Sequence, residues 1–222
     1  MDGRTASVLL LSILASGPEL RAQATQADPT DVQSRFGVQV KLDLPKKWKS
    51  SVAYQARLID NSSVYRGSYF SGELGRPVGK RLGVFTNYRL ARLTGGVTHR
   101  YGIGAELEAA SGDVTLSFRS MFLYQRKVVD DAEQGTRQVL RTRVRAKVAA
   151  TKRLTVYGSV EPYFAFTGVY PIDNWRDTAG LEWEFLKDVT IDLFYIYRPD
   201  YSKIYNRTYH IVGGEISLGL KL

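Results

Sequence analysis

Apolar and polar residues alternate along most of the chain, beginning at Phe36. Every even position from Phe36 to Leu44 is apolar, whereas the odd positions between them are small or polar. The same period of two recurs in residues 114–124, 189–197 and 216–222. A β-strand with one face buried or lipid-facing has this period, because successive side chains point to opposite faces. No segment of comparable length carries the 3.6-residue stripe of a helix, so the sequence predicts an all-β protein.

Short and long connections alternate between these segments. The longer ones lie near residues 60–67, 94–96, 127–138, 167–173 and 203–206. An up-and-down meander has this asymmetry when its two rims face different surroundings, as in outer-membrane barrels with periplasmic turns and external loops. The short connections are basic or built from small residues: Pro45-Lys46-Lys47, Gly79-Lys80-Arg81, Ser111-Gly112-Asp113, Thr151-Lys152-Arg153 and Leu186-Lys187-Asp188.

The sequence therefore predicts an up-and-down antiparallel transmembrane β-barrel of 10–12 strands. Eleven alternating segments can be counted, but single-chain bacterial barrels have even strand numbers, so we expect twelve. Residues 25–35 could supply a further strand, although Asp28-Pro29 disfavours one there. Alternatively, a terminal segment lies outside the ladder or inside the lumen.

A soluble barrel of lipocalin type, binding an apolar ligand inside, is the main alternative because it shares the meander. The two differ in which face is apolar, and periodicity does not decide between them. Strand length favours lipid, since segments of about 10 to 14 residues suit a tilted bilayer crossing. Aromatic residues near the segment ends, such as Trp48, Tyr88, Tyr101, Trp183 and Tyr197, also match an interfacial girdle.

The N-terminus has the layout of a secretory signal peptide. Residues 6–15 form an apolar run, Gly17 and Pro18 follow it, and Ala22-Gln23-Ala24 matches a small-x-small cleavage site. We therefore expect residues 1–24 to be a signal peptide and residues 25–222 to form a single barrel domain. The expected location is the outer membrane of a Gram-negative bacterium.

Composition narrows the possible chemistry. The 222 residues include no cysteine and two histidines, which excludes disulfides and thiolate ligands and leaves too few side chains for a zinc or copper site. We expect no metal and no cofactor. The formal net charge is +9, but the aromatic residues follow lipid-facing spacing, so we expect outer-membrane phospholipid and lipopolysaccharide as partners rather than nucleic acid. The acidic loop with Asp130, Asp131 and Glu133 is a candidate lipopolysaccharide contact, and an envelope protein could be a further partner.

The C-terminal third of the sequence resembles a known family. The stretches NWRDTAGLEWEF (174–185), VTIDLFYIYRP (189–199) and DYSKIYNRTYHIVG (200–213) are similar to the uncharacterised outer-membrane β-barrel family, domain of unknown function 2490. The spacing of the alternating segments resembles that of the family over residues 33–222. It departs from the family at the first strand, where Arg35-Phe36 stands in place of an expected tryptophan. The resemblance implies the fold and the location and supplies no ligand.

The polar phase of the strands carries many charges, which would line the lumen if the apolar phase faces lipid. Opposite charges could pair there into a structural core, since a small barrel is barely wide enough for its own side chains. Alternatively the row Arg141, Arg143 and Arg145 lines a narrow pore for small solutes or binds an anion, because same-face residues stand only ~6.5–7 Å apart along a strand. The predicted lumen residues are Arg57, Arg89, Arg100, Glu106, Glu108, Arg119, Arg141, Arg143, Arg145, Lys147, Glu161, Glu182, Glu184, Asp192, Arg198 and Glu215.

An outer-membrane lipid-modifying enzyme is a further alternative. Serine catalysis normally needs a histidine base with an orienting acid. Only His99 and His210 are present, and the sequence spacing does not pair either of them with a serine as a catalytic base. We therefore expect no catalytic residues and no enzymatic activity.

Overall fold

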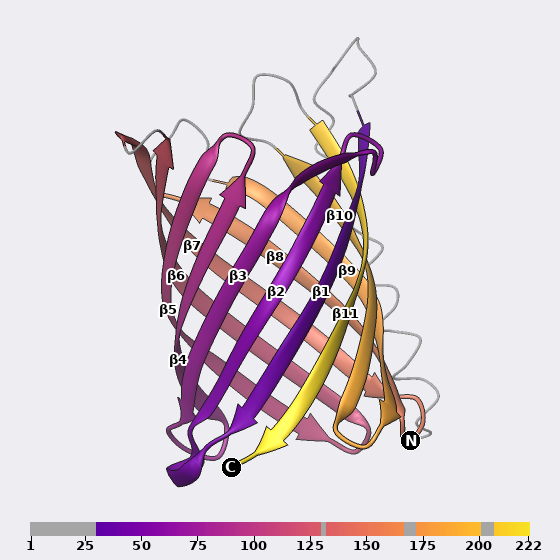
Figure 1. Ribbon diagram of the computed structural model, residues 1–222. Coiled ribbons are helices and arrows are strands. Elements are labelled where there is room, and N and C mark those ends of the chain that lie inside the picture. The colour runs from indigo at the N-terminus through magenta and orange to yellow at the C-terminus, as the bar shows by residue number, and fades with distance from the viewer. Residues whose placement is uncertain (1–29, 130–131, 167–171, 201–206) are drawn as a thin grey trace.

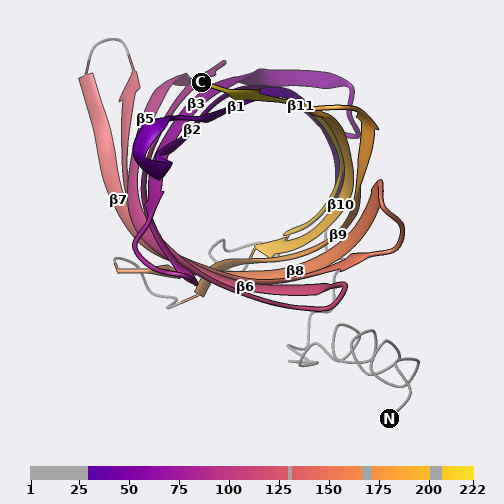
Figure 2. The same cartoon turned by 90° about the horizontal axis from the view of Figure 1, so that it is seen from below.

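The computed structural model describes residues 30–129, 132–166, 172–200 and 207–222, and these form one closed β-barrel (Figures 1 and 2). Each strand pairs with its neighbours in the chain, and the first strand closes the ring on the last. Residues 1–24, where we expect a signal peptide, lie outside the described residues. The strands are β1 Thr30–Asp43, β2 Lys49–Ile59, β3 Val64–Pro77, β4 Leu82–Leu93, β5 Gly96–Ser111, β6 Val114–Val129, β7 Ala132–Ala149, β8 Leu154–Ala165, β9 Ile172–Leu186, β10 Val189–Asp200 and β11 Arg207–Lys221.

The expectation of twelve strands is wrong for the described residues, in which eleven strands close the barrel. Residues 30–35 extend β1 towards the N-terminus instead of forming a strand of their own. β1 pairs antiparallel with β2 on one side, and Val38 lies opposite Tyr54. On its other side it pairs parallel with β11, and Val38 lies opposite Ile216. One parallel pair is required because an odd number of up-and-down strands leaves its first and last members pointing the same way.

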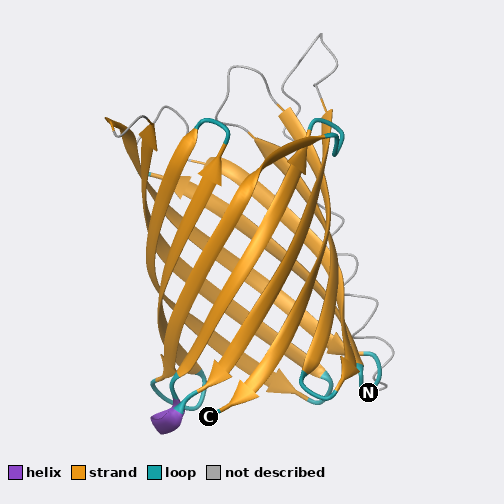
Figure 3. Cartoon of the chain, viewed as in Figure 1, coloured by secondary structure: helices purple, strands orange, loops and turns teal. Residues whose placement is uncertain are grey.

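The connections alternate between two rims as predicted, but length does not separate them. The connection between β4 and β5 spans only residues 94–95, and most of the predicted long connection at residues 127–138 belongs to β6 and β7. All five short connections lie at one rim, together with the C-terminus, and we call this the turn rim (Figure 3). Pro45–Lys47 at this rim forms a single 3-10 turn, labelled η1. The opposite rim, the loop rim, carries the connections that start after β2, β4, β6, β8 and β10. In the part of the chain that is described, no helix has the length and apolar character to cross a membrane.

The apolar phase of the strands faces outward. Phe36, Ile103 and Val212 are 56%, 66% and 54% exposed. Leu116, Phe118 and many other large aliphatic and aromatic side chains are exposed in the same way. A barrel in water would hide these groups inside, whereas a transmembrane barrel presents them to lipid.

The inner face also holds apolar groups, which the alternation did not predict. One cluster is built from Phe85, Met121, Leu123, Val139 and Tyr163. A second consists of Ile196, Tyr209 and Ile211, with Phe194 packed against it. These side chains thicken the inner wall and narrow the space available to a solute.

Glycines on neighbouring strands make room for two of the inward aromatic rings. The ring of Phe194 covers Gly213, where an added Cβ would overlap it. The ring of Tyr157 covers Gly180 in the same way, and a Cβ there would lie 2.5 Å from the ring. Aromatic rings laid over strand glycines fill the surface that the missing side chains leave open.

The charged lumen as candidate functional site

Ion pairs cross the inner wall in the half of the lumen nearer the turn rim. Arg119 on β6 contacts Glu73 on β3 at 2.5 Å and Glu106 on β5 at 3.2 Å. Glu106 also lies 3.7 Å from Arg143 on β7. The guanidinium of Arg119 stacks on the Phe85 ring at 3.6 Å from its centroid. The network therefore joins four strands on one side of the lumen.

A second network lies on β7 to β10. The Lys147 ammonium donates to both oxygens of Glu182, at 2.8 and 2.7 Å. Arg145 lies 3.8 Å from the same carboxylate. The Tyr157 hydroxyl donates to Asp192 at 2.8 Å. Lys147, Arg145 and Asp192 are thereby held by partners on adjacent or next-adjacent strands.

Glu161 on β8 is the buried carboxylate between two arginines. Its side chain is 6% exposed, and it lies 2.6 Å from Arg141 on β7 and 3.6 Å from Arg176 on β9. Arg141, Arg143 and Arg145 are thus each paired with a different carboxylate. Each of these three carboxylates also contacts a second cation: Arg176 for Glu161, Arg119 for Glu106 and Lys147 for Glu182.

Four other arginines lie in the half of the lumen nearer the loop rim without such partners. Arg35 on β1, Arg57 on β2, Arg89 on β4 and Arg100 on β5 form no salt bridge with the described carboxylates, and we call these four the arginine cluster. Arg57 donates to the Gln55 side chain at 2.7 Å and stacks on Tyr69 at 3.7 Å. Arg35 is only 4% exposed. Positive charge is therefore in excess in this part of the lumen.

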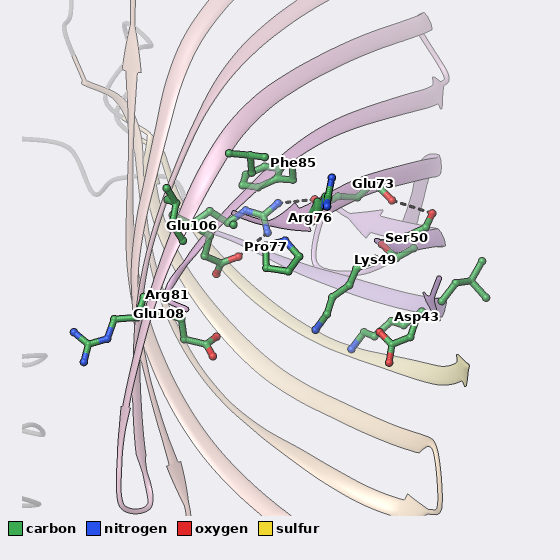
Figure 4. A pocket seen from close by; sticks show the side chains of 18 of the residues that line it. Asp43, Lys49, Ser50, Glu73, Arg76, Pro77, Arg81, Phe85, Glu106 and Glu108 are labelled. Atoms are coloured by element: carbon green, nitrogen blue, oxygen red, sulfur yellow. Dashed lines mark hydrogen bonds and ion pairs between the residues drawn. The ribbon is translucent and has the colours of Figure 1, made fainter. Parts of the chain in front are cut away.

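Cavities open on the lumen from both rims. The largest, the turn-rim cavity, has about 580 Å³ and is lined by β1 to β6, with Glu73, Glu106 and Arg119 on its wall. Figure 4 labels ten of its lining residues, with Lys49 and Asp43 across from Phe85 and Glu106. A second cavity of about 310 Å³ lies at the same rim beside Glu182 and Glu184. A smaller one of about 100 Å³, the loop-rim cavity, is lined by Arg100, Leu123, Gln125, Arg137, Val139, Tyr163, Asn174 and Arg176.

A family model described as "Protein of unknown function (DUF2490)" matches residues 33–208. The chain belongs to this family. Among solved structures, the NanC porin in a rhombohedral crystal form is similar to this DUF2490 member, with a TM-score of 0.55 and 12% identity. The match covers 86% of this chain and 99% of that chain. No curated protein matches the chain. The structural match shows that the chain shares the β-barrel fold of that porin.

The remaining predicted lumen residues of this DUF2490 member lie at other places on the inner wall. Glu108 and Glu184 are exposed at the turn rim and line its two cavities. Arg198 on β10 stacks on Tyr209 at 4.0 Å. Glu215 on β11 is half-buried on the wall beside Gly37.

Arg35, Glu73 and Arg176 are among the charged lumen residues that sequence reasoning missed. Arg35 precedes Phe36, where the first strand was expected to begin, yet it has the same phase as Gln33 and Gly37. Glu73 and Arg176 also lie in the inward phase of their strands and form ion pairs with Arg119 and Glu161. Extending the alternation to both ends of every strand would have found all three.

Both histidines of this family member face outward. His99 accepts or donates a hydrogen bond with the Tyr88 hydroxyl at 2.8 Å, and His210 does so with Tyr195 at 2.6 Å. Glu133, expected in an acidic loop, instead lies in β7 and pairs with Arg126 at 3.0 Å, whereas Asp130 and Asp131 lie outside the described residues. Within the described ranges, no group of three His, Cys, Asp or Glu side chains could hold a metal ion.

Proposed function

We propose that this protein is an outer-membrane channel that passes small polar solutes. The proposal rests on the distribution of polarity, which is the reverse of that in a soluble barrel. Large apolar side chains cover the outside of the barrel, while ion pairs and cavities line its inside. This is the arrangement of outer-membrane barrels. The fold shared with the NanC porin supports the same role.

The cavity sizes suggest which solutes fit. The turn-rim cavity of about 580 Å³ could admit a metabolite, whereas the loop-rim cavity of about 100 Å³ holds only a few non-hydrogen atoms. Inward groups such as Tyr163 and Tyr157 occupy part of the cross-section. We therefore propose a narrow passage with small conductance rather than a wide general pore.

The lipid environment forms part of the proposal. Residues 1–24 would direct export, and phospholipid and lipopolysaccharide would surround the apolar outer face. Aromatic contacts on that face, such as Tyr88 with Tyr101 at 5.1 Å between ring centroids and Trp183 with Phe185 at 5.1 Å, suit the interfacial girdles of such barrels.

Planar-bilayer recording of the refolded protein tests the channel. We expect discrete openings of low conductance in symmetric potassium chloride. A bilayer that stays silent, with protein that shows the heat-shifted gel mobility of a folded barrel, would contradict a pore. Recovery of the mature protein in the periplasmic soluble fraction without detergent would contradict the membrane location.

The same preparation tests the absence of catalysis, which remains part of the proposal. His99 and His210 each bond to a tyrosine on the outer face, and this contact does not activate a serine. We expect no acyl release from labelled phospholipid.

A further inference from the structure

We propose that the arginine cluster binds the oxyanion group, a phosphate or a carboxylate, of an acidic solute. The inference rests on the proposed channel and adds the chemical class of what enters it. The site differs from the row of Arg141, Arg143 and Arg145, because each of those arginines forms an ion pair with a carboxylate.

The strand register places the cluster in two like-charged pairs. Arg35 lies directly opposite Arg57 across β1 and β2. Arg89 lies directly opposite Arg100 across β4 and β5. Like charges facing each other across a sheet repel and destabilise it. Two such pairs on one inner wall need a negative partner, and none of the described carboxylates forms a salt bridge with them.

The two pairs converge on a common region of the lumen. The strongest electrostatic neighbours of Arg57 include Arg100 on β5 together with Arg176 on β9 and Arg198 on β10. Those of Arg35 include Arg176 and Arg198 as well. For all four members of the cluster the leading neighbours are other arginines and the tyrosines Tyr69 and Tyr163, and none is a carboxylate.

Buried donors in the cluster have no acceptor among the described residues. They are Nε and Nη2 of Arg35, Nε of Arg89 and Nε of Arg100. A buried donor without an acceptor is costly, and a donor on a charged group more so. An oxyanion offers several acceptor oxygens and a negative charge together, and the planar guanidinium matches phosphate and carboxylate with two parallel hydrogen bonds.

Two further features fit such a ligand. The face of Arg57 stacks on the Tyr69 ring, which fixes the plane of the guanidinium and leaves part of its edge for another group. Arg100 also lines the loop-rim cavity of about 100 Å³, with Gln125 and Asn174 on the same wall. This space matches one phosphate or carboxylate group.

Calorimetric titration of the detergent-refolded protein tests binding independently of conduction. The probes are inorganic pyrophosphate for phosphate chemistry and citrate for carboxylate chemistry. We expect saturable binding of at least one probe, and the double variant Arg89→Gln with Arg100→Gln should weaken it at least tenfold. The matched control, Lys47→Gln with Lys187→Gln, removes the same charge from exposed turns and should change the affinity less than twofold.

Single Arg100→Lys is the second variant, in case the double variant fails to fold. It keeps the charge but loses the two-pronged donor geometry, so we expect about threefold weaker binding. Absence of saturable binding of both probes to the wild type would overturn the inference. Equal weakening in the variants and the turn control would overturn it too, because general charge would then explain the effect. Whichever probe binds more tightly assigns the solute to phosphates or to carboxylates.

Reversal potentials in a potassium chloride gradient separate this inference from the channel itself. We expect the wild type to prefer chloride and the Arg89→Gln, Arg100→Gln variant to lose that preference, while the turn control keeps it. Openings with the same ion preference in all three proteins would overturn the inference and leave the channel standing. Saturable binding without any openings would uphold the inference and refute the channel.

Discussion

Glu161 illustrates how single residues hold the lumen together. Its carboxylate is enclosed by Arg141 and Arg176, from the strands on either side of β8. Arg176 also stacks on Tyr163, two residues along β8. Because both arginines depend on this one acid, the contact ties β7, β8 and β9 into one block.

We predict that Glu161→Gln destabilises the barrel by about 3 kcal/mol, because the isosteric amide leaves two buried guanidiniums without a counter-charge. Urea-induced unfolding in phospholipid vesicles, followed by tryptophan fluorescence, measures the loss. Glu184→Gln removes the same charge from an exposed position at the turn rim, and we expect a change below about 0.5 kcal/mol there. Equal effects of the two substitutions would show that Glu161 is not a structural counter-charge.

Sequence could assign residues to a face but not to partners. Arg119 pairs with Glu73, which is 46 positions away and three strands along the sheet. A period of two says only that both side chains point inward, whereas the pairing depends on barrel curvature. For the same reason the unpaired charges of Arg35, Arg57, Arg89 and Arg100 could not be told from the paired ones.

Among the elements, the pairing of β1 with β11 has the largest consequence for the fold. It extends along the whole of β1, from Thr30 opposite Thr208 to Asp43 opposite Lys221. The alternation predicted the meander from sequence, whereas the predicted difference in connection length between the rims was wrong because strands such as β7 extend into the expected loops. The strand count was wrong because the parity of other bacterial barrels was applied to eleven visible segments, and no residue pattern marks a closing pair as parallel.

We predict that Val38→Cys combined with Ile216→Cys forms a disulfide across this pair. Adjacent strands lie ~4.8 Å apart, within the range that a disulfide bridges. The chain has no native cysteine to interfere. Faster migration of the heat-denatured protein on a non-reducing gel would report the bond.

The control keeps Val38→Cys and moves the second cysteine to Val212, on the same outer face but four residues further along β11. The two sulfurs are then about 13 Å apart along the strand and should remain free. If a twelfth strand separated β1 from β11, the first pair would fail to cross-link as well.

For the whole molecule, the apolar outer surface decides which environment suits the barrel. Leu193 near the middle of β10 is 50% exposed, and Leu186 at the turn rim is 58% exposed. In water such a surface would drive aggregation, whereas in hydrocarbon it is the favourable one. The same inversion leaves the lumen as the place for polar chemistry.

We predict that Leu193→Arg lowers the free energy of unfolding in vesicles by about 2–4 kcal/mol, since a charge at mid-depth must leave water. Leu186→Arg, close to the head groups, should cost about 0–1 kcal/mol. Unfolding titrations in vesicles of both variants measure this gradient with depth. Equal and negligible effects would indicate that the outer face meets water.

The odd number of crossings also determines where the two ends of the barrel emerge. β1 starts at Thr30 on the loop rim, and the chain finishes at Leu222 on the turn rim (Figure 1). A barrel with an even number of crossings would present both ends at a single mouth. Here an epitope inserted just before Thr30 and another fused after Leu222 would lie on opposite sides of the membrane. The epitope that an antibody binds on intact cells would therefore show which rim faces the outside.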